Sequence, residues 1–177
     1  NQGIPPLPLN AEQVSELVEL LKSPPSGEEE YILDLITNRT PAGVDPAAYV
    51  KAAFLTAIAK GETNSPLIDK KHATELLGTM LGGYNVESLI GLLEDEEVGS
   101  LAAEGLSKTL LMFNAKHDVI ELAKKNENAQ RVVDSWSNGE WFTNKPKLPE
   151  VIKAIVFRVE GEINTDDLSP APDAPSR

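Results

Sequence analysis

The chain has 177 residues, of which 41% are hydrophobic and 25% are charged, a composition typical of a folded soluble protein. Its 28 acidic residues outnumber its 16 Lys and Arg, and the formal charge of −12 argues against binding to phosphate backbones. The absence of cysteine excludes disulfides and thiolate ligands from this stretch. No apolar run reaches the ~20 residues that cross a bilayer, and residues 1–9 do not resemble a secretory signal, so we expect a cytoplasmic protein.

The first helix is expected after residues 1–9, whose prolines prevent helix formation. Asn10 and Gln13 have the spacing of a capping box, and Leu9 can pack on Val14 as a hydrophobic staple. Apolar residues then recur at helical spacing until a Ser-Pro-Pro sequence ends the helix.

The next two helices are also marked by their first residues. Ser26 with Glu29 predicts a second capping box. The acidic residues 28–30 lie where the helix dipole favours negative charge, with a cation site as the alternative interpretation of the run. Asp45 followed by Pro46 predicts the third helix, because proline is favoured at the first helical position.

The remaining helical patterns extend to residue 136. Gly61 is expected to end the third helix, and Asn85 to cap the fifth. The predicted starts of the other later helices are Asp69, about Val98, Asp118 and Asn126. About eight helices joined by short loops predict a mainly α protein of antiparallel helix pairs, either a HEAT-like α-superhelix or a compact bundle.

A change of period marks a second domain. From Val151 onward the apolar residues alternate, so that Ile155, Phe157 and Val159 share one face, which predicts a short β-strand followed by an extended tail. The prolines of residues 145–149 are typical of a hinge. We therefore expect a helical domain at residues 1–149 and the incomplete start of another domain at 150–177. A single strand without a partner also predicts a larger parent protein.

Few residues of the helical part suggest chemistry. His72 and His117 lie far apart without ligand-spaced neighbours, so ordinary helix-start or surface positions are favoured over metal or base roles, and no metal site is predicted. Trp136, Trp141 and Phe142 are expected to be buried at the domain boundary. A base-stacking surface is the alternative, but the nearest charges along the chain are acidic.

Glycines around Met80 have a structural interpretation. Gly78, Gly82 and Gly83 are expected to end a helix or to allow two helices to pack closely. No glycine-rich loop follows a strand and precedes a helix, so the fingerprints of nucleotide binding are absent.

The tail carries a different pattern. Asn164, Thr165, Asp166 and Asp167 place four hydrogen-bonding side chains between the predicted strand and a proline-rich loop. Such residues either form a turn by bonding their own backbone or border a polar site. Arg177 carries a guanidinium fork that suits a carboxylate.

Residues 161–177 resemble the start of the swivel domain of the bacterial aconitase B family. Other segments resemble this family's N-terminal HEAT-like domain, namely residues 18–22, 24–30, 49–52, 57–62, 75–80 and 82–85. The resemblance spans nearly the whole chain, and several motifs occur in one order.

This resemblance implies the N-terminal fragment of a lyase of the tricarboxylic acid cycle. Such aconitases interconvert citrate and isocitrate through cis-aconitate with a 4Fe-4S cluster. The fragment lacks cluster ligands and catalytic residues, so it is expected to hold no cofactor and to be inactive alone. Of the family's substrate-binding residues, only Arg177 is present, as the partner of a tricarboxylate carboxyl group. The candidates for supporting residues around it are Asn164, Thr165, Asp166, Asp167 and Ser176.

The resemblance also implies partners. The helical domain is expected to mediate protein–protein contacts or dimerisation, and the whole protein to bind mRNA. The charge of −12 argues against the helical part as the main RNA-binding surface. Two alternatives stand beside the enzyme-fragment interpretation: a stand-alone helical interaction module, and a regulatory mRNA-binding region of a bifunctional aconitase.

Overall fold

The computed structural model describes residues 7–109, 112, 115–145, 147–154 and 161. Within these residues the protein has nine helices and no strand, which confirms the predicted mainly α class. The helices are α1 (Ala11–Lys22), α2 (Glu29–Asn38), α3 (Pro46–Ala59), α4 (Lys70–Gly78), α5 (Val86–Leu92), α6 (Gly99–Lys108), α7 (Ala115–Ala123), α8 (Glu127–Ser137) and α9 (Glu140–Thr143).

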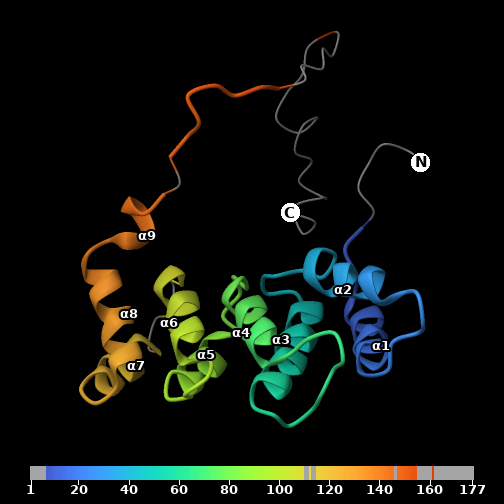
Figure 1. The fold of residues 1–177 in the computed structure, drawn as a ribbon, viewed down its shortest axis with the longest axis horizontal. Helices are drawn as coiled ribbons and strands as arrows, with labels where there is room; N and C mark the ends of the chain where they lie inside the picture. Colours follow the sequence, from blue (N-terminus) through green and yellow to red (C-terminus); the bar gives the residue numbers. More distant parts are fainter. Residues whose placement is uncertain (1–6, 110–111, 113–114, 146, 155–160, 162–177) are drawn as a thin grey trace.

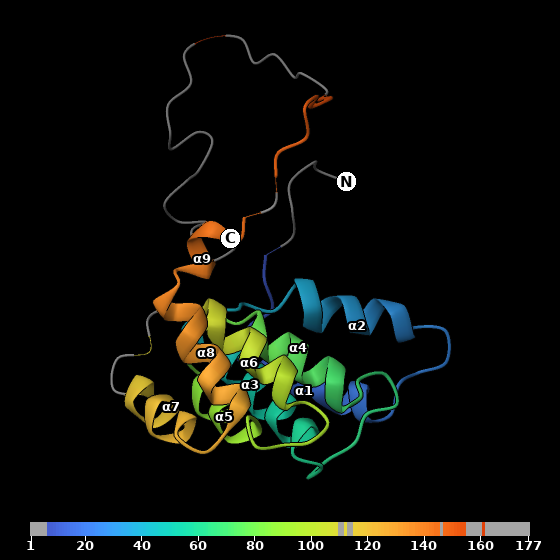
Figure 2. The same cartoon turned by 60° about the vertical axis from the view of Figure 1, so that its left-hand side comes forward.

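Five helices lie side by side in one row, in the order α1, α3, α4, α6 and α8 (Figure 1), and each packs on the next. α2 packs on α1, α5 packs on α6, and α7 packs on α8. Figure 2 shows α5 and α7 together, beside the row rather than within it. The HEAT-like superhelix remains a prediction for this arrangement.

Several helix ends agree with the sequence. The Asn10 side chain accepts from the Gln13 backbone N–H at 2.9 Å, and the Gln13 side chain accepts from the Asn10 N–H at 3.0 Å, as a capping box requires. Asp45 caps α3 through the Ala47 N–H at 2.7 Å. Gly61 has a φ of +75° and ends α3 in a Schellman motif, with hydrogen bonds from residues 61 and 62 back to residues 58 and 57.

Other helix ends correct the sequence predictions. Ser26 does not cap α2: the helix begins at Glu29 with no side-chain cap, and the Glu29 carboxylate accepts from the Gly27 N–H at 2.8 Å. Gly27 has a φ of +90°, so the chain turns there and carries Ser26 away from the helix end. α7 begins at Ala115, three residues before the predicted Asp118.

Asn85 stabilises a turn instead of capping α5. It is fully buried, and its amide donates to the Leu77 carbonyl at 2.7 Å and the Met80 carbonyl at 3.2 Å. Leu77 lies in the last turn of α4 and Met80 just beyond it, where the helix leaves its last acceptors without intrahelical donors. The tertiary position of α4 therefore redirects a side chain that local propensity assigns to the helix start.

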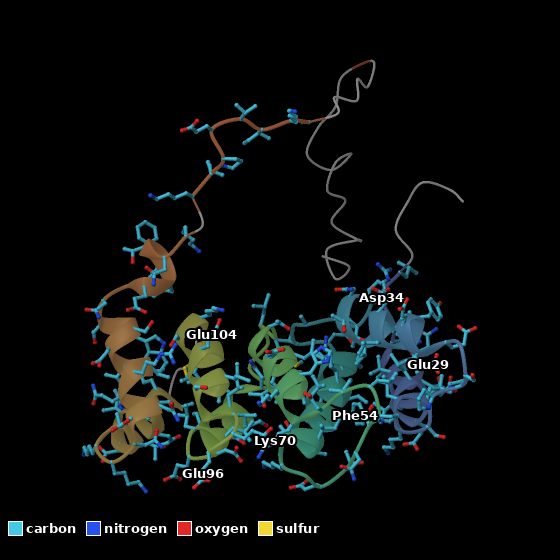
Figure 3. All side chains as sticks on the ribbon, in the orientation of Figure 1. Glu29, Asp34, Phe54, Lys70, Glu96 and Glu104 are labelled. Atoms are coloured by element: carbon cyan, nitrogen blue, oxygen red, sulfur yellow. The ribbon has the colours of Figure 1, made fainter. Side chains whose placement is uncertain are left out.

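The acidic segment at residues 94–97 is held in part by hydrogen bonds. Asp95 accepts from the Lys70 ammonium at 2.6 Å and from the Glu97 and Val98 N–H groups at 2.9 and 3.1 Å. The hydrogen bond from Lys70 is the main reason why the pKa of Asp95 is lowered. Lys70 stands at the start of α4 (Figure 3), so this ion pair ties α4 to the residues that precede α6.

The row shares one hydrophobic core, and two features of it could not be read from the hydrophobic pattern. The first is a close approach of α4 and α6, where a Cβ added to Gly105 would lie 2.9 Å from the Gly78 Cα. The second is Lys51 of α3, which is 1% exposed and whose ammonium donates to the Thr37 carbonyl at 3.4 Å. Thr37 belongs to the last turn of α2, where the helix dipole favours a cation.

Gly105→Ala is expected to destabilise the protein by about 1–3 kcal/mol, because the new methyl group meets the α4 backbone and the helices must separate. Gly91→Ala is the matched control, since nothing lies within 4 Å of its added Cβ, and the better helix propensity of alanine predicts a gain of about 0.5 kcal/mol. Denaturant unfolding measures both. Equal stability of the two variants would show that the close approach is dispensable.

The stability of the domain is expected to rise with pH through the titration of Lys51. Desolvation lowers the pKa of Lys51 from 10.5 to about 8, so between these values the unfolded chain holds a proton that the folded chain has released. Each pKa unit corresponds to about 1.4 kcal/mol, which makes the gain about 3 kcal/mol across this window.

Lys51→Met removes this contribution and is expected to raise the free energy of unfolding most at pH 7 and least near pH 10. Lys60→Met, at the exposed end of the same helix, is the control. Chemical unfolding at a series of pH values measures the effect. A Lys51→Met protein less stable than the parent at every pH would show instead that the bond to the end of α2 dominates.

Candidate functional site

The predicted substrate-binding residue and its neighbours lie outside the described residues. Those residues are Arg177 and its predicted supporting residues Asn164, Thr165, Asp166, Asp167 and Ser176. The alternating segment from Ile155 to Val159 lies there too. Residues 151–154, where the predicted strand would begin, are exposed and have no strand assignment.

The two histidines do not build a site with their neighbours. The His72 backbone N–H is capped by Asp69 at 2.7 Å at the start of α4, and His117 is exposed on α7. Among the residues that the structure describes, no three His, Cys, Asp or Glu side chains come close enough to hold a metal ion. In the same described part, no helix is long and apolar enough to cross a membrane.

Two loops join to form an exposed apolar surface at one edge of the row. The Leu81 N–H donates to the Ala42 carbonyl at 2.8 Å, and the Tyr84 hydroxyl donates to the Val44 carbonyl at 3.1 Å. Backbone bonds therefore hold these loops, residues 40–45 and 79–85, while Val44 and Leu81 remain 76% and 85% exposed. We call this pair of loops the apolar edge. Tyr49 extends it by packing its ring on Tyr84, with centroids 5.4 Å apart.

The end of the helical part is also apolar and exposed. Trp141 and Phe142 of α9 are 43% and 68% exposed, which corrects the prediction that they are buried at a boundary. Trp136 differs, because it packs on the core and its indole N–H donates to the Leu106 carbonyl at 3.1 Å. α9 follows the left-handed turn at Gly139 beyond the end of α8 (Figure 1), and both of its aromatic side chains keep a large exposed fraction.

A polar pocket of about 440 Å³ lies between α6, α8 and α9. Its lining residues, which define the α6–α8 pocket, are Glu104, Ser107, Lys108, Arg131, Ser135, Glu140, Trp141, Asn144 and Lys145. Glu104 stands in the upper part of α6 (Figure 3) and accepts from the Lys108 ammonium at 2.8 Å. That hydrogen bond, the charge of Lys108 and more weakly the charge of Arg131 lower the pKa of Glu104.

The sequence did not predict this pocket. A base-stacking surface at Trp141 was the alternative to burial, and the acidic residues nearest along the chain argued against it. The cations Lys108 of α6 and Arg131 of α8 line the pocket with Trp141 and lie on other helices. The one local signal was the four-residue spacing of Arg131 and Ser135, which places both on one helix face.

A second cavity, of about 280 Å³, continues from the α6–α8 pocket and shares Glu104 and Lys108 with it. It lies over the crossing of α4 and α6, and Gly78 and Gly105 contribute to its lining. Neither cavity holds a nucleophile activated by a neighbouring base, so the arrangement supports binding of a charged group and not covalent catalysis.

Comparison with known proteins identifies relatives along nearly the entire chain. The family described as the aconitate B N-terminal domain matches residues 1–142. Aconitate hydratase B of Pseudomonas aeruginosa is 65% identical over 177 residues, which are 99% of this chain and 20% of the relative. The aconitate hydratase B of Escherichia coli is 60% identical over 99% of this chain and 20% of its own length.

The chain thus spans about a fifth of the length of these curated relatives. A more distant one, the aconitate hydratase B of Helicobacter pylori, is still 46% identical over 179 residues. The family match covers every helix of the row and the relatives cover the tail as well. The chain belongs to the aconitase B family and corresponds to the N-terminal part of its proteins.

Proposed function

We propose that this chain is the N-terminal part of an aconitate hydratase that interconverts citrate and isocitrate through cis-aconitate. The observation that carries the proposal is the 65% identity to an aconitate hydratase B across 99% of the chain. The helical domain then serves as the attached, non-catalytic part of the enzyme. The tail at 150–177, proposed as the start of the swivel domain, brings the chain to the edge of the substrate site.

The 4Fe-4S cluster of such an enzyme does not fit the residues of this chain. Cluster irons require thiolate ligands, and the chain contains no cysteine. Among the described residues, no three Asp, Glu or His side chains lie close enough together to hold a metal ion either. The cluster ligands are therefore expected in the remaining four fifths of the whole protein, and the chain alone is expected to show no aconitase activity.

The helical domain is proposed to dock on the rest of the enzyme through the apolar edge and α9. Both present large apolar side chains to solvent, and clustered exposure of this kind marks interaction surfaces. The α2–α3 loop, the end of α4 and α9 all lie on the side of the row from which residues 147–154 extend (Figure 1). The domains that follow in the whole protein are thus tethered next to these side chains, at high effective concentration.

A homodimer or a separate protein partner is the competing occupant of the same surface. The mRNA-binding role is proposed only for the whole protein, since this chain opposes phosphate with its charge of −12. The molecular mass of the isolated chain in solution tests the homodimer, because a dimer formed by this surface persists without the catalytic domains.

Arg177→Ala in the whole enzyme is expected to raise KM for citrate at least tenfold, because one charge-assisted, bidentate contact to a carboxylate is lost. Arg177→Lys is expected to recover only part of the loss, since an ammonium cannot make the paired contact. Steady-state kinetics on the iron-reconstituted enzyme provide the measurement. Lys153→Ala, an exposed cation of the linker, is the control. Unchanged kinetics in Arg177→Ala would remove Arg177 from the substrate site.

Leu81→Glu combined with Phe142→Glu is expected to free the helical domain from the rest of the enzyme. Both side chains are more than two-thirds exposed, so the free energy of unfolding of the isolated chain should change by no more than about 0.5 kcal/mol. In the whole enzyme, limited proteolysis at residues 145–154 should accelerate severalfold. Leu20→Glu, at an exposed position of α1, is the matched control. Equal cleavage rates in all three proteins would contradict docking through this surface.

A further inference from the structure

The α6–α8 pocket is lined by a serine whose hydroxyl makes no hydrogen bond to a described residue. Ser135 of α8 is 5% exposed, lines the pocket, and forms no hydrogen bond through its side chain with any residue that the structure describes. Its Oγ is not among the enclosed side-chain atoms without a partner, which among the described residues are limited to Asn85 Oδ1, so the Ser135 hydroxyl is open to the pocket and can bind a molecule there.

Other helical serines nearby show what Ser135 does not do. Ser107 donates to the Ala103 carbonyl at 2.8 Å, and Ser137 donates to the Val133 carbonyl at 2.9 Å. This bond to the carbonyl four residues earlier is the ordinary outlet of a serine within a helix. Ser135 lacks it although it sits on the same helix as Ser137, and its hydroxyl remains available to a molecule in the pocket.

Three cationic side chains line the same pocket as this hydroxyl. Arg131 lies one turn earlier on the same face of α8, is exposed, and makes no hydrogen bond or ion pair with a described residue. Lys145 lines the pocket and is likewise unpaired within the described part of the chain, whereas Lys108 is engaged by Glu104. With Glu104 and Glu140, the lining carries three positive and two negative charges, a net of +1 in a chain of −12.

The pocket also has one apolar wall. Trp141 lines it with an indole ring that is 43% exposed. A volume of about 440 Å³ lies in the range of small-molecule sites, which combine apolar walls with a few placed polar groups. The net charge of +1 suits one anionic group, whereas a polyanion such as nucleic acid meets the two carboxylates and the acidic surface.

We propose that the α6–α8 pocket binds a small organic monoanion, a carboxylate with a flat apolar portion. The carboxylate accepts from the guanidinium of Arg131 and the hydroxyl of Ser135, with Lys145 nearby, and the flat portion packs on Trp141. The proposal uses no residue of the tail and does not involve Arg177, so it holds whether or not the proposed aconitase activity is found.

The test titrates the isotope-labelled chain with benzoate, a ring with a single carboxylate, and follows the amide of Ser135 and the indole N–H of Trp141 by NMR. Saturable shifts confined to the pocket are expected at millimolar benzoate. Benzyl alcohol keeps the ring without the charge, inorganic phosphate keeps the anion without the ring, and both are expected to bind at least about tenfold more weakly.

Variants assign the contacts. Arg131→Gln is expected to weaken benzoate binding about tenfold, because a charge-assisted contact is lost. Ser135→Ala is expected to weaken binding severalfold and to leave the unfolding midpoint unchanged or raised, because its hydroxyl makes no internal bond. Lys116→Gln, an exposed cation of α7 outside the pocket, should bind benzoate as the parent does.

Three results would overturn the proposal. The first is the absence of saturable shifts at the pocket. The second is benzyl alcohol or phosphate binding as tightly as benzoate. The third is an Arg131→Gln affinity equal to that of Lys116→Gln, which would show only a general attraction of the anion to surface cations.

Discussion

The close approach of α4 and α6 at Gly78 and Gly105 is the constraint on which the row of helices depends. Side chains at these two positions would separate the backbones, and α6 would no longer lie near enough to α4 to share its core. Both α8 and α9 pack on α6. The indole N–H of Trp136 in α8 also donates to the Leu106 carbonyl of α6. The same contact therefore sets where both cavities lie.

The apolar edge stays exposed because its loops are held by hydrogen bonds of their backbone, while its apolar side chains face solvent. The loops at residues 40–45 and 79–85 bond to each other through their backbone and Tyr84, and the buried amide N–H groups of Asn85 satisfy the carbonyls of Leu77 and Met80. Because the backbone is satisfied inside, apolar side chains such as Val44 and Leu81 can face outward without loosening the fold. The surface proposed for docking is thus rigid before a partner arrives, which lowers the entropy lost on binding.

Charge is distributed so that the helical part repels polyanions while one pocket attracts an anion. Ion pairs such as Lys70 with Asp95 and Lys108 with Glu104 neutralise cations within the domain. Arg131 forms no ion pair within the described residues and lines the pocket together with Ser135, whose hydroxyl makes no hydrogen bond to a described residue. Lys51 is the opposite case, a cation placed in the core, where desolvation lowers its pKa to about 8.

The sequence by itself determined most of the helices and several caps, because these depend on residues within about one turn of each other, and it indicated the family through motifs that occur in one order along the chain. Asn10 with Gln13 and Asp45 with Pro46 were readable for that reason. Tertiary structure decided what depends on residues beyond one turn: the carbonyls that engage Asn85 and the exposure of Trp141. Ser26 is a local exception, because the turn at Gly27 takes it from the helix end although its sequence spacing suits a capping box. Tertiary structure also built the α6–α8 pocket from three helices. Spacing along one helix fixes a face, but only packing decides what that face meets.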